Sequence, residues 1–209
     1  MKTILKHKLT LAIILAMLMG AANVQAVDYD LSICGVQVTD ANKDNLTAAI
    51  NNAGNGSTIT GTVKFNSDNN TVRLENANIY TPGVAIAGSN NKVELVGNNT
   101  ITSLHDGIVA VSSIEGKGTL NINITSDNGV AIGTEGYSLT IRDCTINTNG
   151  GVSIVGSDDI LTFENAAITV TNSNTNYGAI IRFNDIRFNS CEINQPIGAV
   201  FNPQKKGNL

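Results

Sequence analysis

The sequence predicts an all-β protein, a right-handed parallel β-helix of about six coils with a cap at its N-terminal end. Three observations support this fold. Apolar residues alternate with other residues over short segments, which is the period of a β-strand. These segments recur about every 22 residues from Thr71 onwards, which is typical of stacked solenoid repeats. Gly, Asn, Thr and Ser are abundant and only 14% of the residues are charged, which suits short strands joined by tight turns.

The repeat can be laid out coil by coil, with apolar strand positions followed by a turn, a second strand and a glycine. The glycines that end the coils are Gly83, Gly107, Gly129, Gly151, Gly178 and Gly198. The apolar pairs that open the coils are Val72/Leu74, Val93/Leu95, Leu139/Ile141, Leu161/Phe163 and Ile186/Phe188, with Leu120, Ile122 and Ile124 in an abbreviated third coil. Leucine-rich repeats share the period, but their denser leucine pattern is absent. We therefore expect a three-faced solenoid whose neighbouring coils lie ~4.8 Å apart.

Stacking places like residues above one another in the turns. Ala77, Cys144, Ala166 and Cys191 should share one tight inward position. Cys144 and Cys191 would then lie two coils apart, roughly 9 to 10 Å, which is too far for a disulfide bond. We expect both to be buried free thiols.

Outward positions should form ladders as well. The predicted turn ladder consists of Asn76, Asp143, Asn165 and Ser190. On the neighbouring strands, Arg73 should face Glu94 and Arg142 should face Glu164, which places opposite charges on adjacent coils. A structural role for these arginines is favoured over a catalytic one.

The two ends of the chain do not follow the repeat. Residues 1–26 have the charged, apolar and small-residue regions of a secretory signal peptide that ends at Ala26. Residues 27–66 read as a cap: a strand from Tyr29 to Val38, a short helix that begins at Asp40 and ends near Gly54, and a strand through Val63 and Phe65. The β-helix then spans 67–209. No C-terminal cap is visible, so the chain is either a fragment or meets a partner at that end.

Removal of the signal peptide changes the charge balance. It takes three of the 13 basic residues and none of the 17 acidic ones, so the formal charge of −4 becomes −7. Nucleic acid is not an expected partner of such a chain. Export predicts a secreted or cell-surface protein that does not span a membrane, since no later apolar run approaches ~20 residues.

The segment YDLSICGVQVTDAN from Tyr29, followed by GTVKFNSDNNTVRLENANI from Gly61, resembles the opening of a family of bacterial surface β-helix proteins. Members of this family are common in gut anaerobes and are often labelled carbohydrate-binding. The resemblance continues through the repeats. It implies an extracellular or surface location and contact with glycan, and it transfers no catalytic residues.

Polysaccharide lyases and hydrolases also use this fold, so an enzyme is one alternative. The residues of this sequence do not favour an enzyme. After signal removal His105 is the only histidine, which excludes a site with two histidine ligands. Asp158 and Asp159 are similar to the paired aspartates of polygalacturonases, but no Gly-His-Gly or Arg-Ile-Lys follows them, and a solvated turn is the favoured interpretation.

Polar turn residues suggest two candidate cation sites. Side chains before the glycine column on three successive coils could bring oxygen atoms together around calcium. The candidate calcium ligands are Asp106, Asp127, Asn128 and Asn149, beside His105. Glu135, Asp158, Asp159 and Asp185 fall in the opposite turn, where stacked carboxylates would repel unless a cation bridges them. Solvated turn residues are the alternative at both places.

The candidate ligand-binding residues lie in the largest insertion, Thr169 to Tyr177. They are Asn172, Asn174, Asn176 and Tyr177. Loops on rigid scaffolds often carry binding residues, and tyrosine rings stack on sugars. Tyr80 and Tyr137 also lie near loops, whereas Phe163, Phe183 and Phe188 should face the core. Asparagine and threonine ladders on the faces offer hydrogen bonds to a glycan without stacking.

The sequence is compatible with three functions. The first is a non-catalytic surface module that binds glycan or mediates adhesion, with calcium as a candidate cofactor. The second is a purely structural or interaction solenoid. The third is a polysaccharide lyase or glycoside hydrolase.

Overall fold

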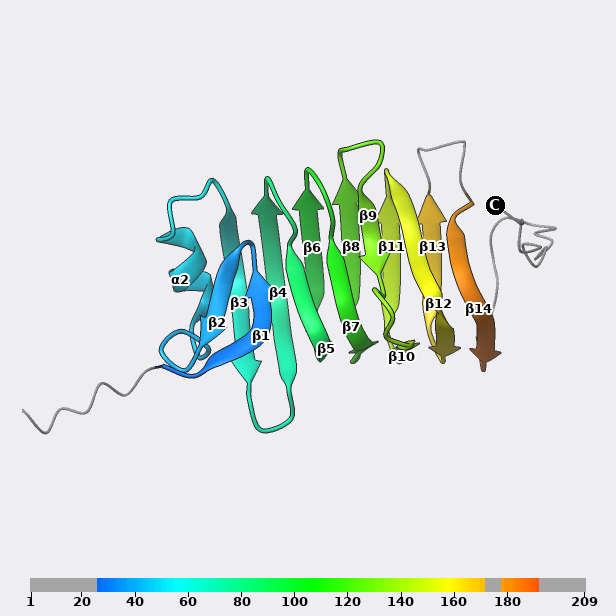
Figure 1. Cartoon of the computed structure of the whole chain (residues 1–209), viewed down its shortest axis with the longest axis horizontal. Helices are drawn as coiled ribbons and strands as arrows, with labels where there is room; N and C mark the ends of the chain where they lie inside the picture. The colour runs from blue at the N-terminus through cyan, green and yellow to red at the C-terminus, as the bar shows by residue number, and fades with distance from the viewer. Residues whose placement is uncertain (1–25, 172–177, 192–209) are drawn as a thin grey trace, which may run out of the picture.

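The chain is a parallel β-solenoid of about five turns, and 64% of it is strand, as the repeat predicts (Figure 1). The computed structural model describes residues 26–171 and 178–191. The expected signal peptide therefore lies outside the described residues, apart from Ala26. No helix among the residues described has the length and apolarity needed to cross a membrane.

The described elements form one continuous sheet with a short helix at its N-terminal end. They are β1 (Asp28–Ile33), β2 (Val36–Thr39), α2 (Leu46–Asn51), β3 (Thr58–Asn66), β4 (Thr71–Thr81), β5 (Ile86–Val96), β6 (Asn98–Ser103), β7 (Ile108–Glu115), β8 (Thr119–Ile124), β9 (Val130–Gly133), β10 (Leu139–Arg142), β11 (Thr145–Asn149), β12 (Val152–Glu164), β13 (Ala167–Thr171) and β14 (Ile180–Asn189). Several strands bend at a turn and so contribute to two faces.

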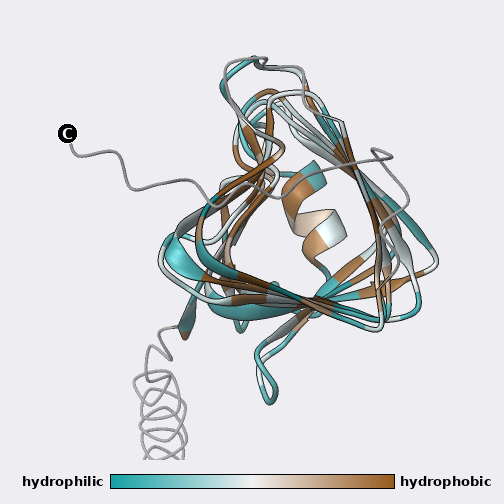
Figure 2. Cartoon of the chain, turned by 90° about the vertical axis from the view of Figure 1, so that its right-hand side faces the viewer, coloured by the Kyte–Doolittle hydropathy of each residue, from teal (hydrophilic) through white to brown (hydrophobic). Residues whose placement is uncertain are grey.

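The strands stack into three faces, which give the triangular outline in Figure 2. The charged face contains the first part of β4, the last parts of β5 and β7, then β10 and the last parts of β12 and β14. The Asn/Thr face contains the last part of β4, then β6, β8, β11 and β13. The short face contains the first parts of β5 and β7, then β9 and the first parts of β12 and β14.

Apolar side chains stack in inward columns that run through the coils. On the charged face the register aligns Val72, Val93, Ile114, Ile141, Phe163 and Phe188. On the Asn/Thr face it aligns Ile59, Ile79, Ile101, Ile122, Thr148 and Val170. Full burial of one such aliphatic side chain contributes about 1.5–3 kcal/mol, so the columns are the main source of stability.

The third coil differs from the predicted layout. Its strand on the charged face is β7, in which Ile114 takes the position of Val93. Leu120 and Ile122, expected to open the coil, lie instead in β8 on the Asn/Thr face. From the fourth coil onwards the register on the charged face therefore differs by two residues from the predicted layout. Ile141, rather than Leu139, aligns with Val72 and Val93.

Two glycines explain this shift. A Cβ on Gly116 would lie 2.5 Å from the carbonyl oxygen of Leu95, and one on Gly118 would lie 2.8 Å from that of Gly97. The third coil thus turns directly against the backbone of the coil before it, which only glycine allows. The sequence pattern hid β7 because its run Ile108, Val109, Ala110 and Val111 is apolar without alternation and buried throughout.

The predicted turn ladder is confirmed for Asp143, Asn165 and Ser190, which align in register, whereas Asn76 lies two residues further along its coil. Asn76, Asp143, Asn165 and Ser190 all adopt left-handed backbone conformations, with φ between 47° and 55°. Asn and Asp tolerate this region because their side chains bond to nearby groups. Asn165 Nδ2 donates to Asp143 Oδ1 at 2.8 Å, and Asn76 Oδ1 accepts from the backbone N–H of Asn98 at 3.1 Å. Each turn is therefore fastened to its neighbour.

The inward turn position was predicted only in part. Cys144 and Ala166 do lie on neighbouring coils, since Ala167 N–H donates to the Cys144 carbonyl. Ala77 does not share their position. It aligns with Asn99, two residues further along the face.

The cysteines are free, as expected, with Cys34 and Cys144 buried. Cys191 is only half-buried, so the expectation that it is a buried thiol was wrong. It lies at the end of the described chain, beyond β14, where no further coil is described.

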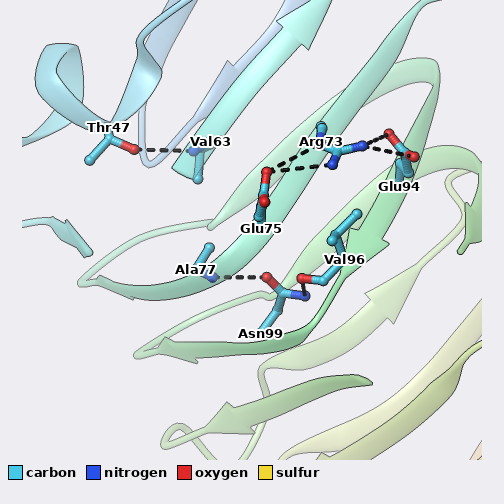
Figure 3. A network of polar contacts seen from close by, with 8 residues as sticks. All are labelled: Thr47, Val63, Arg73, Glu75, Ala77, Glu94, Val96 and Asn99. Atoms are coloured by element: carbon cyan, nitrogen blue, oxygen red, sulfur yellow. Dashed lines mark hydrogen bonds and ion pairs between the residues drawn. The ribbon is translucent and has the colours of Figure 1, made fainter. Parts of the chain in front are cut away.

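The charged face carries the predicted ladder of opposite charges in a modified form. Arg73 Nη1 contacts both carboxylate oxygens of Glu94 at 3.1 Å, and Glu75 lies on its other side (Figure 3). Arg142 aligns with Glu164 in register, as predicted, but its ion pair is with Glu115 on the preceding coil. Such half-exposed pairs contribute at most about 1 kcal/mol each, so they select register more than they add stability.

A buried asparagine fastens the first three coils together. Asn99 is fully buried, and its Oδ1 accepts from the N–H of Ala77 at 2.9 Å (Figure 3). Its Nδ2 lies 3.2 Å from the Val96 carbonyl oxygen and 3.4 Å from that of Thr119. Both ends of the amide thus have partners, as a buried polar group requires.

The N-terminal cap contains the three predicted parts, with two corrections. The expected strand from Tyr29 to Val38 is a hairpin, β1 and β2, that turns at Cys34 and Gly35, both with positive φ. The helix begins at Asn45 instead of Asp40. Asn45 Oδ1 accepts from Ala48 N–H at 3.2 Å, whereas Asp40 Oδ1 accepts from the Tyr29 hydroxyl at 2.5 Å.

The cap closes the first coil on all three faces. β3 runs antiparallel to the whole length of β4, and β1 pairs with Ile86 and Ala87 at the start of β5. Helix α2 lies across the end of the solenoid and fills the centre of the triangle in Figure 2. Thr47 on this helix accepts from Val63 N–H at 3.1 Å (Figure 3). Each face of the first coil therefore pairs with a strand of the cap, which protects this end from edge-to-edge association. The expectation for the C-terminal end concerns residues 192–209, outside the described range.

The inward column of the Asn/Thr face makes one prediction about stability. Thr148 replaces isoleucine in this column, is only 2% exposed, and is the one buried side chain in the described chain whose polar atom, Oγ1, lacks a hydrogen-bond partner. Thr148→Val keeps the shape and removes the cost of the unsatisfied hydroxyl. We expect the free energy of unfolding in urea to rise by about 1–3 kcal/mol.

Thr145→Val is the matched control, because Thr145 lies on the same strand but faces outward and should change stability by less than about 0.5 kcal/mol. If Thr148→Val is neutral or destabilising, the hydroxyl is satisfied in solution.

Candidate functional site

The Asn/Thr face carries three outward columns in which each strand places matching polar residues. The first contains Asn98, Thr119, Thr145 and Ala167. The second contains Thr60, Asn78, Thr100, Asn121, Asn147 and Thr169. The third contains Thr58, Tyr80, Thr102, Asn123, Asn149 and Thr171. β6, β8, β11 and β13 lie side by side in Figure 1, so these columns cover a continuous surface.

None of the side chains in these three columns is charged. The neighbouring charged face presents Arg73, Glu94, Glu115, Arg142 and Glu164 in one column. The solenoid thus separates its surface into one ionic and one neutral hydrogen-bonding face. Parallel strands ~4.8 Å apart, with alternate residues ~6.6 Å apart along each strand, make the neutral face a regular grid of amide and hydroxyl groups.

Hydrogen bonds hold the central amides of this grid in place. Asn147 Nδ2 donates to Asn121 Oδ1 at 2.9 Å, and Asn121 Nδ2 donates to the Asn99 carbonyl at 3.3 Å. A primary amide offers two N–H donors and two acceptor lone pairs, so these bonds use only part of its capacity. The side chains are therefore oriented before any ligand arrives, which reduces the entropy cost of binding.

An exposed aromatic ring lies at the N-terminal end of the grid. Tyr80 is 42% exposed, between Thr58 and Thr102 in the third column. Leu104 is 39% exposed, and its N–H donates to the carbonyl of Thr81, so it lies on the coil next to Tyr80. This corner combines an amphipathic ring with an apolar side chain.

The predicted ligand-binding residues Asn172, Asn174, Asn176 and Tyr177 lie outside the described residues. Thr171, the last described residue before them, belongs to the third column of the Asn/Thr face. Tyr137 is half-buried, and its hydroxyl shares a 3.1 Å hydrogen bond with Ser89 Oγ.

The predicted calcium ligands are spread over two kinds of position. Asp127 and Asn128 are exposed in the turn between β8 and β9, and Asn149 belongs to the third column of the Asn/Thr face. Asp106 Oδ1 accepts from the N–H of Val130 at 2.7 Å, which joins its turn to the next coil. In the described part of the chain, no three His, Cys, Asp or Glu side chains group as a metal site would require. Calcium binding stays a prediction.

The second acidic cluster has structural roles. Asp159 is only 8% exposed, and its carboxylate accepts from the Thr134 hydroxyl and from Ser157 N–H. The expectation of a solvated Asp158-Asp159 turn thus holds for the exposed Asp158 but was wrong for Asp159. Asp185 Oδ2 pairs with Arg187 at 2.7 Å.

Phe163, Phe183 and Phe188 were predicted to face the core, and they differ in how far they are buried. Phe163 is fully buried and Phe183 packs against the core. Phe188 stacks on Phe163 with ring centroids 5.2 Å apart, but it is 38% exposed. No coil is described beyond it.

Two buried thiols have strongly raised pKa values. Burial raises the pKa of Cys34 from 9.0 to about 11, although hydrogen bonds to Thr81 and Ser57 act in the opposite direction. Burial, together with the nearby carboxylate of Asp143, raises the pKa of Cys144 from 9.0 to about 12. Both thiols are therefore protonated and unreactive at neutral pH, which makes them core residues rather than nucleophiles.

Comparison of the chain with family models, curated proteins and solved structures found no match. Among the described residues, the predicted sites in the turns are not joined into one centre. The columns of the Asn/Thr face do form one continuous surface. The sequence pattern could identify the residue types in these columns but not the register that aligns them.

The buried thiols predict a loss of stability at alkaline pH. In the unfolded chain a cysteine ionises near 9.0, whereas the folded chain keeps Cys144 protonated to about 12. Between these values the unfolded state has lost a proton that the folded state still holds, so the free energy of unfolding falls as the pH rises. The stabilisation is complete below the unfolded pKa and is lost through the folded one.

Cys144→Ala should remain folded, because alanine occupies the same position at Ala166, and its unfolding free energy should fall less steeply above pH 9. Denaturant unfolding of both proteins at a series of pH values measures this. Parallel curves for the two proteins would show that the thiol is ionised in the folded state as readily as in the unfolded one.

Proposed function

We propose that this chain is a non-catalytic, secreted or cell-surface module of a bacterium that binds glycan through the Asn/Thr face. The observation that carries the proposal is the register. It aligns asparagine, threonine and tyrosine side chains in uncharged outward columns over six strands. Hydroxyl and amide groups are the natural partners of sugar hydroxyls, and a rigid sheet presents them without further ordering.

The aromatic corner supports the same function. The exposed ring of Tyr80 stands at one end of the grid and offers a stacking surface for a sugar ring. Tyr177, in the insertion that follows Thr171 in the sequence, is expected to add a second ring. An aromatic anchor followed by hydrogen-bonding rows suits adhesion to a polysaccharide surface.

The cellular location is proposed from the N-terminal residues. Lys2, Lys6 and Lys8 precede an apolar run and a small-residue end at Ala26, the pattern of an exported protein. Glycans at the outside of a bacterium are the ligands such a protein would meet.

A binding experiment tests the proposal directly. The mature chain from Val27 to Leu209 is passed over gels that carry different immobilised polysaccharides, with calcium and with a chelator. We expect retention on at least one gel. The combined variant Tyr80→Ala, Thr100→Val and Thr102→Val should lose retention by about tenfold or more, because it removes one ring and two hydroxyls.

The matched control is the variant Thr140→Val and Thr162→Val, which removes two hydroxyls from the charged face instead. It should bind as the unchanged protein does, and equal melting temperatures would show that all variants fold. Loss of retention with chelator alone would assign a role to Asp106, Asp127, Asn128 and Asn149. Absence of retention on every gel would favour a structural solenoid, and released sugar ends would favour an enzyme.

A further inference from the structure

We infer that the ligand of the Asn/Thr face is a neutral, extended polysaccharide that lies along the solenoid axis and is contacted by one coil after another. This inference rests on the proposed function and names its substrate class. Three features of the described residues carry it: the absence of charge in the outward columns, the direction in which like side chains repeat, and the position of the exposed ring.

The first feature selects against charged polymers. A uronic acid or sulfated chain needs cationic partners, and none lies in the outward columns of this face. Arg73 and Arg142 are on the charged face and are already paired with Glu94 and Glu115. Lys117 is exposed in the bend before β8 and lies outside the columns. The formal charge of −7 that remains after removal of the signal peptide (10 basic and 17 acidic residues) adds a weak long-range repulsion of acidic polymers. A neutral polysaccharide can bind this face without the cost of removing water from charged groups.

The second feature sets the direction of the ligand. Along one strand the face offers only two or three outward residues before a turn, whereas along the axis each of the two long columns runs over six strands. The central column reads Thr60, Asn78, Thr100, Asn121, Asn147 and Thr169. Five steps of ~4.8 Å extend over about 24 Å. The step is close to the length of one pyranose residue in an extended chain, so each coil can meet one sugar.

The third feature supplies an end point. Tyr80 interrupts the outer column near its N-terminal end, where its ring is 42% exposed. A sugar stacked on this ring would align the following residues with Thr102, Asn123 and Asn149 on successive coils. The stacked sugar therefore fixes the register of the chain, and the columns then add contacts in proportion to its length.

A length series tests this arrangement. The mature chain is titrated with neutral oligosaccharides from disaccharide to octasaccharide, prepared from the polysaccharide that the gels retain, and with polygalacturonate and heparin as acidic polymers. We expect affinity to rise by about three- to tenfold for each added sugar and to level off at about six residues, because each coil adds roughly one or two hydrogen bonds. The affinity should not change between low and high salt.

Substitution in the middle of the face tests the direction. Asn121→Leu interrupts the central column, so the hexasaccharide should bind this variant only about as well as a trisaccharide does. The affinity for the trisaccharide itself should be unchanged, because it can occupy the coils on the N-terminal side of Asn121. Thr169→Val, at the far end of the column, should remove only the last step of the series. Thr140→Val on the charged face is the control.

The outcomes separate this inference from the proposed function. Affinity that does not grow beyond a disaccharide, or tighter binding of the acidic polymers with a strong salt dependence, would overturn the inference and leave glycan binding intact. Failure to bind any of the sugars or polymers would overturn both.

Discussion

Every coil of this protein depends on hydrogen bonds and side-chain contacts with the coils on either side of it. A single coil has no partner for its backbone groups and no second layer for its apolar side chains. Parallel pairing in register supplies both at once, since it places Ile79 on Ile101 and Ile101 on Ile122 inside the solenoid. The same register aligns whatever residues lie outside. The outer surface is therefore organised by the constraint that builds the core.

This constraint explains why the faces differ in chemistry. A column of like charges would repel along its length. On the charged face Glu94 and Glu115 are neighbours, but each glutamate of the column also lies next to an arginine, Glu94 beside Arg73 and both Glu115 and Glu164 beside Arg142. The Asn/Thr face avoids the problem with neutral side chains that bond to one another, as Asn147 does to Asn121. Such ladders stabilise the stack, and their remaining donors and acceptors form the regular surface that we propose as the binding face.

The repeat and the cap could be read from the sequence because they depend on local patterns. Alternating apolar residues fix the strands, and a positive-φ turn needs Asn, Asp or Gly, as at Asn76 and Asp143. The exact register could not be read, because it depends on how closely two backbones approach. Gly116 and Gly118 allow a contact with Leu95 and Gly97 that shifts the third coil, and β7 is buried without alternation, so no local pattern marked it.

The candidate site could be predicted from the sequence only in part, for the same reason. Asparagine and threonine ladders could be expected on some face, but Tyr80 could not be assigned to the column of Thr102 before the register was known. The insertion at Asn172, Asn174, Asn176 and Tyr177 lies outside the described residues, so its part in binding stays a prediction. Asp159 looked like a solvated turn residue because sequence does not show that Thr134 covers it.

The most direct test of the account is to observe the side-chain amides of the solenoid by NMR while a neutral hexasaccharide is added. The account predicts that the signals of Asn121, Asn123 and Asn147 shift together, whereas those of the turn residues Asn76 and Asn165 do not. Shifts confined to the turns or to residues of the charged face would contradict the claim that the Asn/Thr face is the binding surface.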